Sequence, residues 1–353
     1  MSKPHIYVGL SGGVDSSVTA ALLKEQGYTV TGVYMKNWSQ DLPGFSCPWK
    51  EDYQDAMRVA VQLGIDFKMY DFQTEYRQKV VDYMIEGYKA GITPNPDIMC
   101  NQEVKFKLFL ETALSDGADG IATGHYARTA NGQLLVGIDI NKDQSYFLCR
   151  VTEDALKKTM FPLGDMKKTD VRVLAKKYGL ATAEKKDSQG ICFIGSVGIK
   201  EFLEQFVQTH SGDIIDVSSD QVVGQHEGAL FYTIGQRRGL SVGGGLPYYV
   251  VGKDMATNQV FVTHDLANKK LWSERVNLSS VHWINAQPTE DTPYQVRLRH
   301  RAPLVACSLN THNHEWVVNF SQSMRSVTPG QSAVIYDGDR VVGSGIVTTT
   351  QVA

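Results

Sequence analysis

Cysteine, proline and long apolar runs are scarce in this sequence. Only five cysteines and 11 prolines occur among 353 residues. A sparse, odd-numbered set of cysteines excludes a disulfide-stapled secreted scaffold and indicates free thiols in a reducing compartment. No apolar run approaches the roughly 18 residues that span a bilayer, and the segment before the first strand has no room for a signal-peptide core. We therefore expect a soluble, cytoplasmic protein that contacts no membrane.

A strong charge of one sign is also absent, because 35 Lys and Arg nearly balance 38 Asp and Glu. The average hides one basic stretch between Lys157 and Lys186, which has nine basic and three acidic residues. Local patches, and not net charge, decide contacts with phosphates, so an RNA partner is not excluded. Within this stretch, the basic helix around Lys167–Lys177 is expected either to hold an RNA body or to be a solvated helix.

The predicted secondary structure changes along the chain. Up to about residue 150, strand patterns at 5–10 and 28–35 alternate with helix patterns at 16–26 and 75–88. This alternation predicts an α/β domain whose parallel sheet is covered on both faces. After residue 211 glycine is dense and short strands dominate, which favours β-rich domains and a final β-barrel. We predict an α/β domain over 1–210, a central β-rich domain over 211–275 and a C-terminal β-barrel over 276–353.

A glycine- and serine-rich segment follows the first predicted strand and leads into a helix. Backbone N–H groups and the positive helix end would there point at one anion. Asp15 in this segment can hold a hydrated Mg²⁺. The segment has neither the Walker pattern nor the Gly-x-Gly-x-x-Gly pattern of dinucleotide sites. It reads Gly9-Leu10-Ser11-Gly12-Gly13-Val14-Asp15-Ser16-Ser17.

This segment resembles the pyrophosphate loop (PP-loop) of the N-type ATP pyrophosphatases. The resemblance implies an adenine-nucleotide hydrolase-like fold for the first domain, with ATP and Mg²⁺ as ligands and no permanently bound cofactor. It also implies cleavage of ATP between the α and β phosphates, followed by adenylation of an oxygen atom. The alternative is a plain helix cap rich in serine and glycine.

Two cysteines lie in contexts unlike those of the others. Cys100 follows Asn95-Pro96-Asp97 in a predicted loop before a helix, where a helix N-terminus favours the thiolate. Cys192 lies between Gly190 and Gly195, which allow a backbone to approach a ligand closely. A cysteine is more often a small buried hydrophobic residue. We keep that interpretation for Cys47, Cys149 and Cys307.

Together these segments resemble the tRNA-specific 2-thiouridylases, which install sulfur at C2 of the wobble uridine. The resemblance extends over nearly the whole chain, and it implies that the domain over 1–210 is catalytic and that the central domain over 211–275 contacts tRNA. It departs from the family at His300, where the family often has an aromatic residue, and slightly at 243–249. The segments that carry it are 11–17, 95–100, 123–128, 142–148, 187–195, 232–240 and 329–331.

The resemblance implies a reaction in two steps. AMP is transferred to the C2 oxygen of uracil and pyrophosphate leaves at the loop. A persulfide on Cys192 then attacks C2. Cys100 breaks the sulfur–sulfur bond or completes the transfer, and a Cys100–Cys192 disulfide is left. A persulfide-carrying donor protein and an external thiol reductant are the implied partners, besides the anticodon loop of tRNAs for Lys, Glu and Gln. Asp97 is expected to be a general acid/base, or else a turn residue after Pro96.

Further residues are expected at the nucleotide and tRNA sites. Met35 and Gly124 are the expected neighbours of adenine or ribose. Arg297, Arg299 and Arg301 alternate, so they are expected on one face of a strand as a row of phosphate contacts, or as a merely solvated face. The flipped uridine and its surroundings are expected near a larger set: Asn95, Pro96, Asp97, His125, Lys142, Asp143, Gln144, Arg299, His300 and Gln331.

Three other interpretations stay open. An ATP-dependent amide- or argininosuccinate-forming synthetase could use the same loop, although it leaves Cys100 and Cys192 unexplained. A non-enzymatic RNA-binding module could merely sense ATP, against which the intact loop argues. An iron–sulfur cluster could use both cysteines and a third ligand, although the cysteines are widely spaced. The sequence identifies neither the sulfur donor, the reductant nor the oligomeric state.

Overall fold

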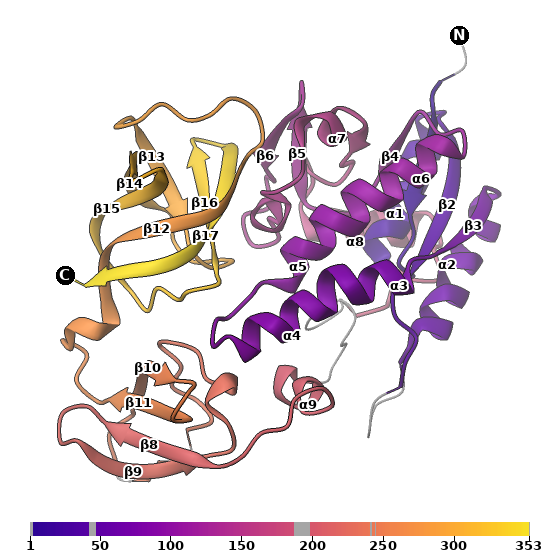
Figure 1. Cartoon of the computed structure of the whole chain (residues 1–353). Coiled ribbons are helices and arrows are strands. Elements are labelled where there is room, and N and C mark those ends of the chain that lie inside the picture. Colours follow the sequence, from indigo (N-terminus) through magenta and orange to yellow (C-terminus); the bar gives the residue numbers. More distant parts are fainter. Residues whose placement is uncertain (1–2, 42–46, 187–197, 241, 244, 353) are drawn as a thin grey trace.

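The computed structural model describes residues 3–41, 47–186, 198–240, 242–243 and 245–352 (Figure 1). Its first part is built on a five-stranded sheet in the order β3-β2-β1-β4-β7, in which all paired strands run parallel. The parallel sheet expected from the sequence is thus confirmed. The strands are β1 (His5–Gly9), β2 (Thr29–Lys36), β3 (Asp66–Asp71), β4 (Gly120–Ala122) and β7 (Thr159–Met160).

Alternating side chains of the central strand bury both faces of this sheet. Ile6 and Val8 pack against residues of the first two helices, whereas Tyr7 packs in a separate core with the helices of the opposite face. The first face carries α1 (Val14–Glu25) and α2 (Trp49–Leu63), and α8 (Lys168–Lys177) packs beside α1.

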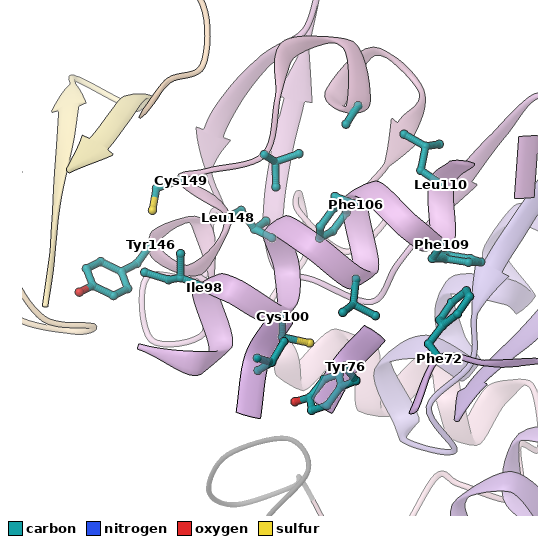
Figure 2. Packing of buried hydrophobic residues seen from close by; sticks show 14 of the residues in the cluster. Phe72, Tyr76, Ile98, Cys100, Phe106, Phe109, Leu110, Tyr146, Leu148 and Cys149 are labelled. Carbon is teal, nitrogen blue, oxygen red and sulfur yellow. The ribbon is translucent and has the colours of Figure 1, made fainter. Parts of the chain in front are cut away.

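The opposite face carries two long helices, each with a π-helical segment in it. The first runs as α3 (Gln73–Tyr76), η1 (Arg77–Val81) and α4 (Asp82–Lys89). The second runs as α5 (Pro96–Met99), η2 (Cys100–Leu108) and α6 (Phe109–Ser115). Buried aromatic side chains lie between them and the sheet, as Figure 2 shows for Phe72, Tyr76, Phe106 and Phe109.

The rest of the chain forms two β-rich units. The central unit is a four-stranded sheet in the order β10-β11-β8-β9. It is preceded by α9 (Ile199–Leu203) and consists of β8 (Gly212–Asp216), β9 (Gln221–His226), β10 (Tyr249–Asp254) and β11 (Gln259–Thr263).

The C-terminal unit is a closed barrel, because its first and last strands, β12 and β17, also pair. This confirms the predicted class of an α/β domain followed by β-rich domains and a barrel. The strands are β12 (Trp272–Trp283), β13 (Pro293–Arg297), β14 (Val305–His312), β15 (Glu315–Arg325), β16 (Ser332–Asp337) and β17 (Arg340–Val352).

A hairpin of the first domain extends the sheet of the barrel. β5 (Ala127–Ala130) and β6 (Gln133–Val136) are antiparallel, and β6 pairs with β17 through Leu134 and Leu135. The short helix α7 (Glu153–Lys157) packs on this hairpin. The barrel is therefore fixed directly to the α/β domain. In the described part of the chain, no helix has both the length and the apolar composition to cross a membrane.

Candidate functional site

The predicted phosphate loop connects β1 to α1 and is tied to itself by serine hydroxyls. Ser11 N–H donates to Ser16 Oγ at 3.2 Å, and Ser17 Oγ donates to the Gly13 carbonyl at 2.7 Å. Gly12 has φ +73°, and a Cβ there would lie 2.4 Å from the Asp52 carbonyl oxygen. Only glycine fits this tight turn. The loop and the start of α1 form the kind of concave backbone that binds phosphate.

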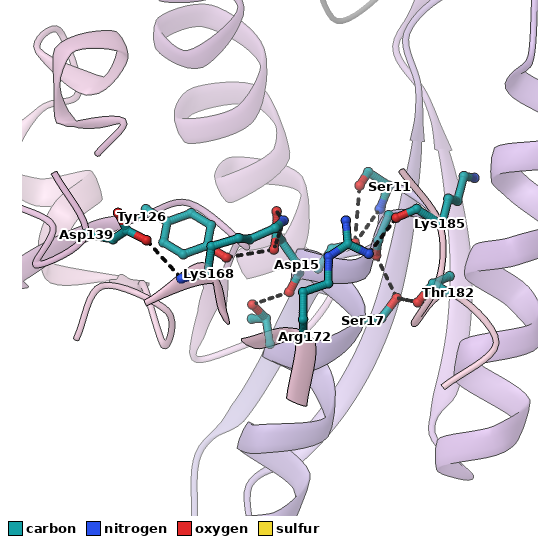
Figure 3. A network of polar contacts seen from close by, with 12 residues as sticks. Ser11, Asp15, Ser17, Tyr126, Asp139, Lys168, Arg172, Thr182 and Lys185 are labelled. Carbon is teal, nitrogen blue, oxygen red and sulfur yellow. Dashed lines mark hydrogen bonds and ion pairs between the residues drawn. The ribbon is translucent and has the colours of Figure 1, made fainter. Parts of the chain in front are cut away.

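Asp15, in the first turn of α1, is held by two side chains from distant parts of the sequence (Figure 3). Lys168 Nζ lies 2.7 and 2.8 Å from its two carboxylate oxygens, and the Tyr126 hydroxyl donates to Oδ1 at 2.9 Å. Sequence reasoning missed Lys168, which is the first residue of α8.

The predicted Mg²⁺ role of Asp15 is limited by this ion pair. Both carboxylate oxygens already accept bonds from Lys168 Nζ, so a cation would share Asp15 with this ammonium group. Among the described residues, no group of three or more His, Cys, Asp or Glu could hold a metal ion. The described residues around Asp15 would therefore offer Mg²⁺ this one carboxylate and no further acidic ligand set.

The predicted basic stretch folds back onto the same loop. Lys185 Nζ lies 2.8 Å from Asp52 and 2.7 Å from Asp55. Burial lowers the pKa of Lys185, but its hydrogen bonds to the two carboxylates outweigh burial and raise that pKa overall. Thr182 Oγ1 donates to Ser17 Oγ at 3.0 Å. Part of the basic stretch therefore contacts the phosphate loop and the neighbouring helix α2.

A cavity of about 300 Å³ opens next to the loop. Met35 and Gly124, the predicted neighbours of adenine or ribose, both line it together with Ser11, Asp15 and Ser16. A Cβ on Gly124 would lie 2.7 Å from the Ser16 nitrogen, so this position admits only glycine. The wall also has four aromatic side chains, which suit a flat base: Tyr34, Trp38, Trp49 and Tyr76. We call this space the nucleotide cavity.

A second cavity, of about 500 Å³, continues from the phosphate end of the first. We call it the polar cavity. Five residues that the sequence assigned to the target base or to acid/base chemistry line it together: Asp97, His125, Lys142, Gln144 and His300. The two cavities share six lining residues, which are Ser11, Asp15, Asp52, Lys105, His125 and Gln144. The structure therefore brings this part of the predicted site together.

Asn101 also lines the polar cavity and was not among the predicted site residues. Its Nδ2 donates to the Phe147 carbonyl at 3.0 Å, which identifies the other atom of the amide as the acceptor Oδ1. This Oδ1 is buried without a hydrogen-bond partner among the described residues, as is Nδ1 of His300. Buried polar atoms without partners beside a cavity indicate a site for a polar ligand. The sequence pointed to Asn101 only by its position, directly after Cys100.

His125 lines both cavities and has a lowered pKa. Burial lowers its pKa well below the usual value, and the nearby charge of Lys105 adds to this effect. Its Nδ1 lies 2.8 Å from the Thr123 hydroxyl. At neutral pH His125 therefore contributes hydrogen bonding to the cavity wall and no positive charge.

The segment that contains Asp97 and Cys100 was predicted as a loop, and this is wrong. The helix begins at Pro96, and the Asn95 side chain caps it by accepting a bond from Ile98 N–H at 3.3 Å. Asn95 thus supplies the turn-stabilising bond considered for Asp97, and Asp97 lines the polar cavity in the first helical turn. Pro96 is buried at the first position of the helix, where a missing N–H costs nothing.

Cys100 lies one turn further, at the start of η2, and its side chain is only 2% exposed. In Figure 2 it lies beside Tyr76, inside the helical core. Cys192 falls in the segment 187–197, outside the described residues, and so does its predicted pairing with Cys100. Burial raises the pKa of Cys149 to about 11 and that of Cys307 to about 12, as expected for thiols packed as hydrophobic side chains. Cys47 is half-buried and lines the nucleotide cavity.

Three predicted tRNA contacts bind other parts of this chain. The buried Asp143 accepts bonds from Gly137 N–H and from Ser145. Arg299 NH2 donates to the carbonyls of Ile234 and Ser326, and Gln331 Nε2 donates to the Thr93 carbonyl. The predicted row of three arginines on one strand is also wrong, because β13 ends at Arg297 and Arg301 has φ +63°.

Comparisons with known proteins match three successive family models. They are described as a tRNA methyl transferase HUP domain at residues 4–196, a tRNA methyl transferase PRC-barrel domain at 200–264 and an aminomethyltransferase β-barrel domain at 273–347. Two curated relatives, each named tRNA-specific 2-thiouridylase MnmA, are 46% identical to this chain. The one from Streptococcus sanguinis aligns over 98% of this chain and 95% of the relative. The one from Bacillus subtilis aligns over 97% and 94%.

Proposed function

The chain belongs to the family of the tRNA-specific 2-thiouridylases, and we propose from this membership that it thiolates C2 of the wobble uridine in tRNAs for Lys, Glu and Gln. ATP supplies the activation, and a persulfide supplies the sulfur. The observation that carries the proposal is the continuity of the two cavities. Ser11 and Asp15 line both, so a nucleotide held at the loop faces Asp97 across the polar cavity.

The first step is adenylation of the target base. With adenine against Met35 and Gly124 and the phosphates on the loop, the α-phosphate points into the polar cavity. The C2 oxygen of the flipped uracil attacks it, the bond between the α and β phosphates breaks, and pyrophosphate leaves along the loop. Mg²⁺ on the phosphates would offset their charge. Asp97 acts as the acid/base group that exchanges a proton with the base.

The second step replaces the activated oxygen with sulfur. The terminal sulfur of a persulfide on Cys192 attacks C2, and AMP leaves with the former C2 oxygen. The Cys100 thiolate then attacks the sulfur bonded to the Cys192 side chain. The sulfur–sulfur bond breaks, its electrons stay on the sulfur bound to C2, and 2-thiouridine and a Cys100–Cys192 disulfide result. An external thiol reductant restores the two cysteines, and a donor protein reloads Cys192. We place this reaction in the cytoplasm.

One assay tests the reaction and its substrate together. Purified protein is incubated with ATP, Mg²⁺, a small-molecule persulfide that can transfer its outer sulfur to Cys192, and unmodified tRNA, and the tRNA nucleosides are analysed by mass. A wobble uridine heavier by the difference between sulfur and oxygen supports the proposal. In a parallel reaction that also contains a methyl donor, a gain equal to a methylene group would instead support methyl transfer, the activity named in two of the family descriptions. No change of mass, with pyrophosphate still released, would support a synthetase that activates another acceptor.

Two substitutions separate the steps. Cys192→Ser should abolish thiolation and leave tRNA-dependent pyrophosphate release intact, because adenylation needs no sulfur. Asp97→Asn should lower pyrophosphate release itself, because it removes the proposed acid/base group and keeps the shape of the side chain. A loss of both activities in Cys192→Ser, or full activity in Asp97→Asn, would contradict the assigned roles.

A further inference from the structure

Thr93 lies in the short loop between α4 and α5, two residues before the Asn95 cap, and both β-rich units hold it. Its N–H donates to the Pro329 carbonyl at 3.0 Å, and its own carbonyl accepts from Gln331 Nε2 at 2.8 Å. Its hydroxyl lies 3.1 Å from the hydroxyl of Thr233 in the central unit. In Figure 1 this loop extends from the α/β domain toward both units.

The barrel approaches Thr93 too closely for any side chain at Gly330. Gly330 has φ +90°, and a Cβ there would lie 2.8 Å from the Thr93 nitrogen. Backbone bonds to Val347 fix Gly330 and Gln331 on the barrel, at 2.9 Å each. The Gln331 amide is therefore a rigidly mounted donor aimed at the Thr93 carbonyl.

The two β-rich units are also bound to each other beside this point. Arg299 NH2 donates to the Ile234 carbonyl at 3.1 Å and to the Ser326 carbonyl at 2.9 Å. A Cβ on Gly235 would lie 2.3 Å from Cβ of Ser326. Segments 232–240 and 329–331 stood out in the sequence, yet neither lines the nucleotide cavity or the polar cavity. Instead, the two segments contact Thr93 and join the central unit to the barrel, so their role in the fold is to hold this junction together.

Thr93 leads directly into the helix that carries the proposed reacting groups. Asn95 caps this helix, Asp97 faces the polar cavity from its first turn, and Cys100 follows one turn later. A helix moves as a rigid element over such a short distance, so a shift of its first turn moves both side chains. We propose that Gln331 and Thr233 are positioning residues, which act through Thr93 to set the place of Asp97 and Cys100. This inference rests on the proposed function for the roles of those two groups.

The first test separates positioning from direct contact with tRNA. Gln331→Ala removes the donor, and Gln331→Glu keeps the shape but presents a carboxylate to the Thr93 carbonyl. Both should lower kcat for tRNA-dependent pyrophosphate release by about two- to tenfold, the effect of one hydrogen bond, with KM for tRNA unchanged. Gln322→Ala, an exposed glutamine of the same barrel, is the matched control and should behave as wild type. A raised KM at unchanged kcat, largest for Gln331→Glu, would overturn the inference.

The second test needs no turnover and so stands apart from the proposed reaction. Alkylation of Cys100 by iodoacetamide is followed by peptide mass analysis in the absence of tRNA, with buried Cys149 as an internal reference. Gln331→Ala should speed alkylation of Cys100 by about two- to tenfold and leave Cys149 unchanged. Equal acceleration of both cysteines would mean general loosening, and no acceleration would mean that the junction does not position the helix. Either result would overturn the inference, whether or not the protein thiolates tRNA.

A double-mutant cycle tests whether Thr233, in the central unit, contributes to positioning the helix. Thr233→Val and Thr93→Val each remove one hydroxyl of the pair and keep the side-chain shape. If the contact acts as inferred, each single variant lowers kcat and the double variant is no slower than the slower single one. Independent, multiplicative losses would show that the two hydroxyls act separately, and would remove Thr233 from the positioning role.

Discussion

Lys168 Nζ bonds both carboxylate oxygens of Asp15, at 2.7 and 2.8 Å, across 153 residues of sequence. The lysine side chain is 13% exposed and the aspartate 31%, so the pair is partly shielded from water. A negative carboxylate beside a phosphate loop would repel a polyphosphate. Lys168 offsets that charge and also fixes the orientation of the carboxylate.

Replacing Lys168 should therefore weaken nucleotide binding. Lys168→Met keeps the length of the side chain, removes the charge and leaves Asp15 uncompensated. We expect affinity for ATP to fall by about tenfold or more, in line with about 1.5–3 kcal/mol for a charged hydrogen bond. Titration calorimetry of ATP with Mg²⁺ measures this directly.

The double variant Asp15→Asn with Lys168→Met tests the electrostatic part of that argument. It has neither charge, so it should recover part of the lost affinity, provided that repulsion by Asp15 causes the loss. Lys176→Met on the same helix, whose lysine pairs with the exposed Glu184, is the control and should bind ATP as wild type does. Unchanged affinity in Lys168→Met would show that the ion pair only stabilises the fold.

A substitution at Gly124 gives a prediction that rests only on steric overlap. Its Cβ would lie 2.7 Å from the Ser16 nitrogen and 2.8 Å from the Asp15 carbonyl carbon, both in the backbone of the phosphate loop. Gly124→Ala should thus displace the loop and abolish measurable ATP binding in the same titration. Gly243→Ala, with no atom of the described residues within 4 Å of its Cβ, is the matched control. Normal ATP binding by Gly124→Ala would place the nucleotide away from this loop.

Local sequence was enough to predict the loop and its neighbours, because strand, glycine turn and helix follow one another within residues 9–17. It could not predict Lys168, since nothing near that residue shows that α8 packs beside α1. The helix start at Pro96 was predictable, because an Asn cap followed by Pro is a usual first turn. The π-helical segment from Cys100 onward lies where the two long helices contact each other, and local sequence does not show this contact. Arg299 and Gln331 each contact a residue of another unit, Ile234 and Thr93, which local sequence does not bring near them.

His125 predicts how stability depends on pH. Its folded pKa lies well below the usual value, because burial disfavours the charged form. The unfolded chain therefore binds more protons once the pH falls below about 6.5, and stability is lost as the pH falls toward the folded pKa. The contribution is fully present above about pH 6.5 and changes by at most about 1.4 kcal/mol per pH unit.

Scanning calorimetry of wild type and His125→Gln between about pH 7.5 and 5.5 measures this contribution. The transition temperature of the wild type should fall more steeply with acidification than that of the variant, which has no imidazole to protonate at this position. Other histidines with a lowered pKa, such as His226 and His282, titrate in both proteins and cancel in the comparison. Parallel curves would show that the pKa of His125 is not lowered on folding.

Substitutions of two cysteines distinguish a thiol that only packs in the core from a thiol that takes part in the reaction. Cys149 is fully buried with a pKa of about 11, so almost none of it is thiolate at neutral pH. Cys149→Ser should keep tRNA thiolation, at a cost in thermal stability from placing a hydroxyl in an apolar site.

Cys100→Ser should keep ATP binding and pyrophosphate release but produce no 2-thiouridine, because no thiolate is left to break the persulfide bond. Nucleoside mass analysis of tRNA treated with each variant measures which of the two thiols thiolation requires. Loss of thiolation in a folded Cys149→Ser variant, or its survival in Cys100→Ser, would assign the sulfur relay to a different thiol.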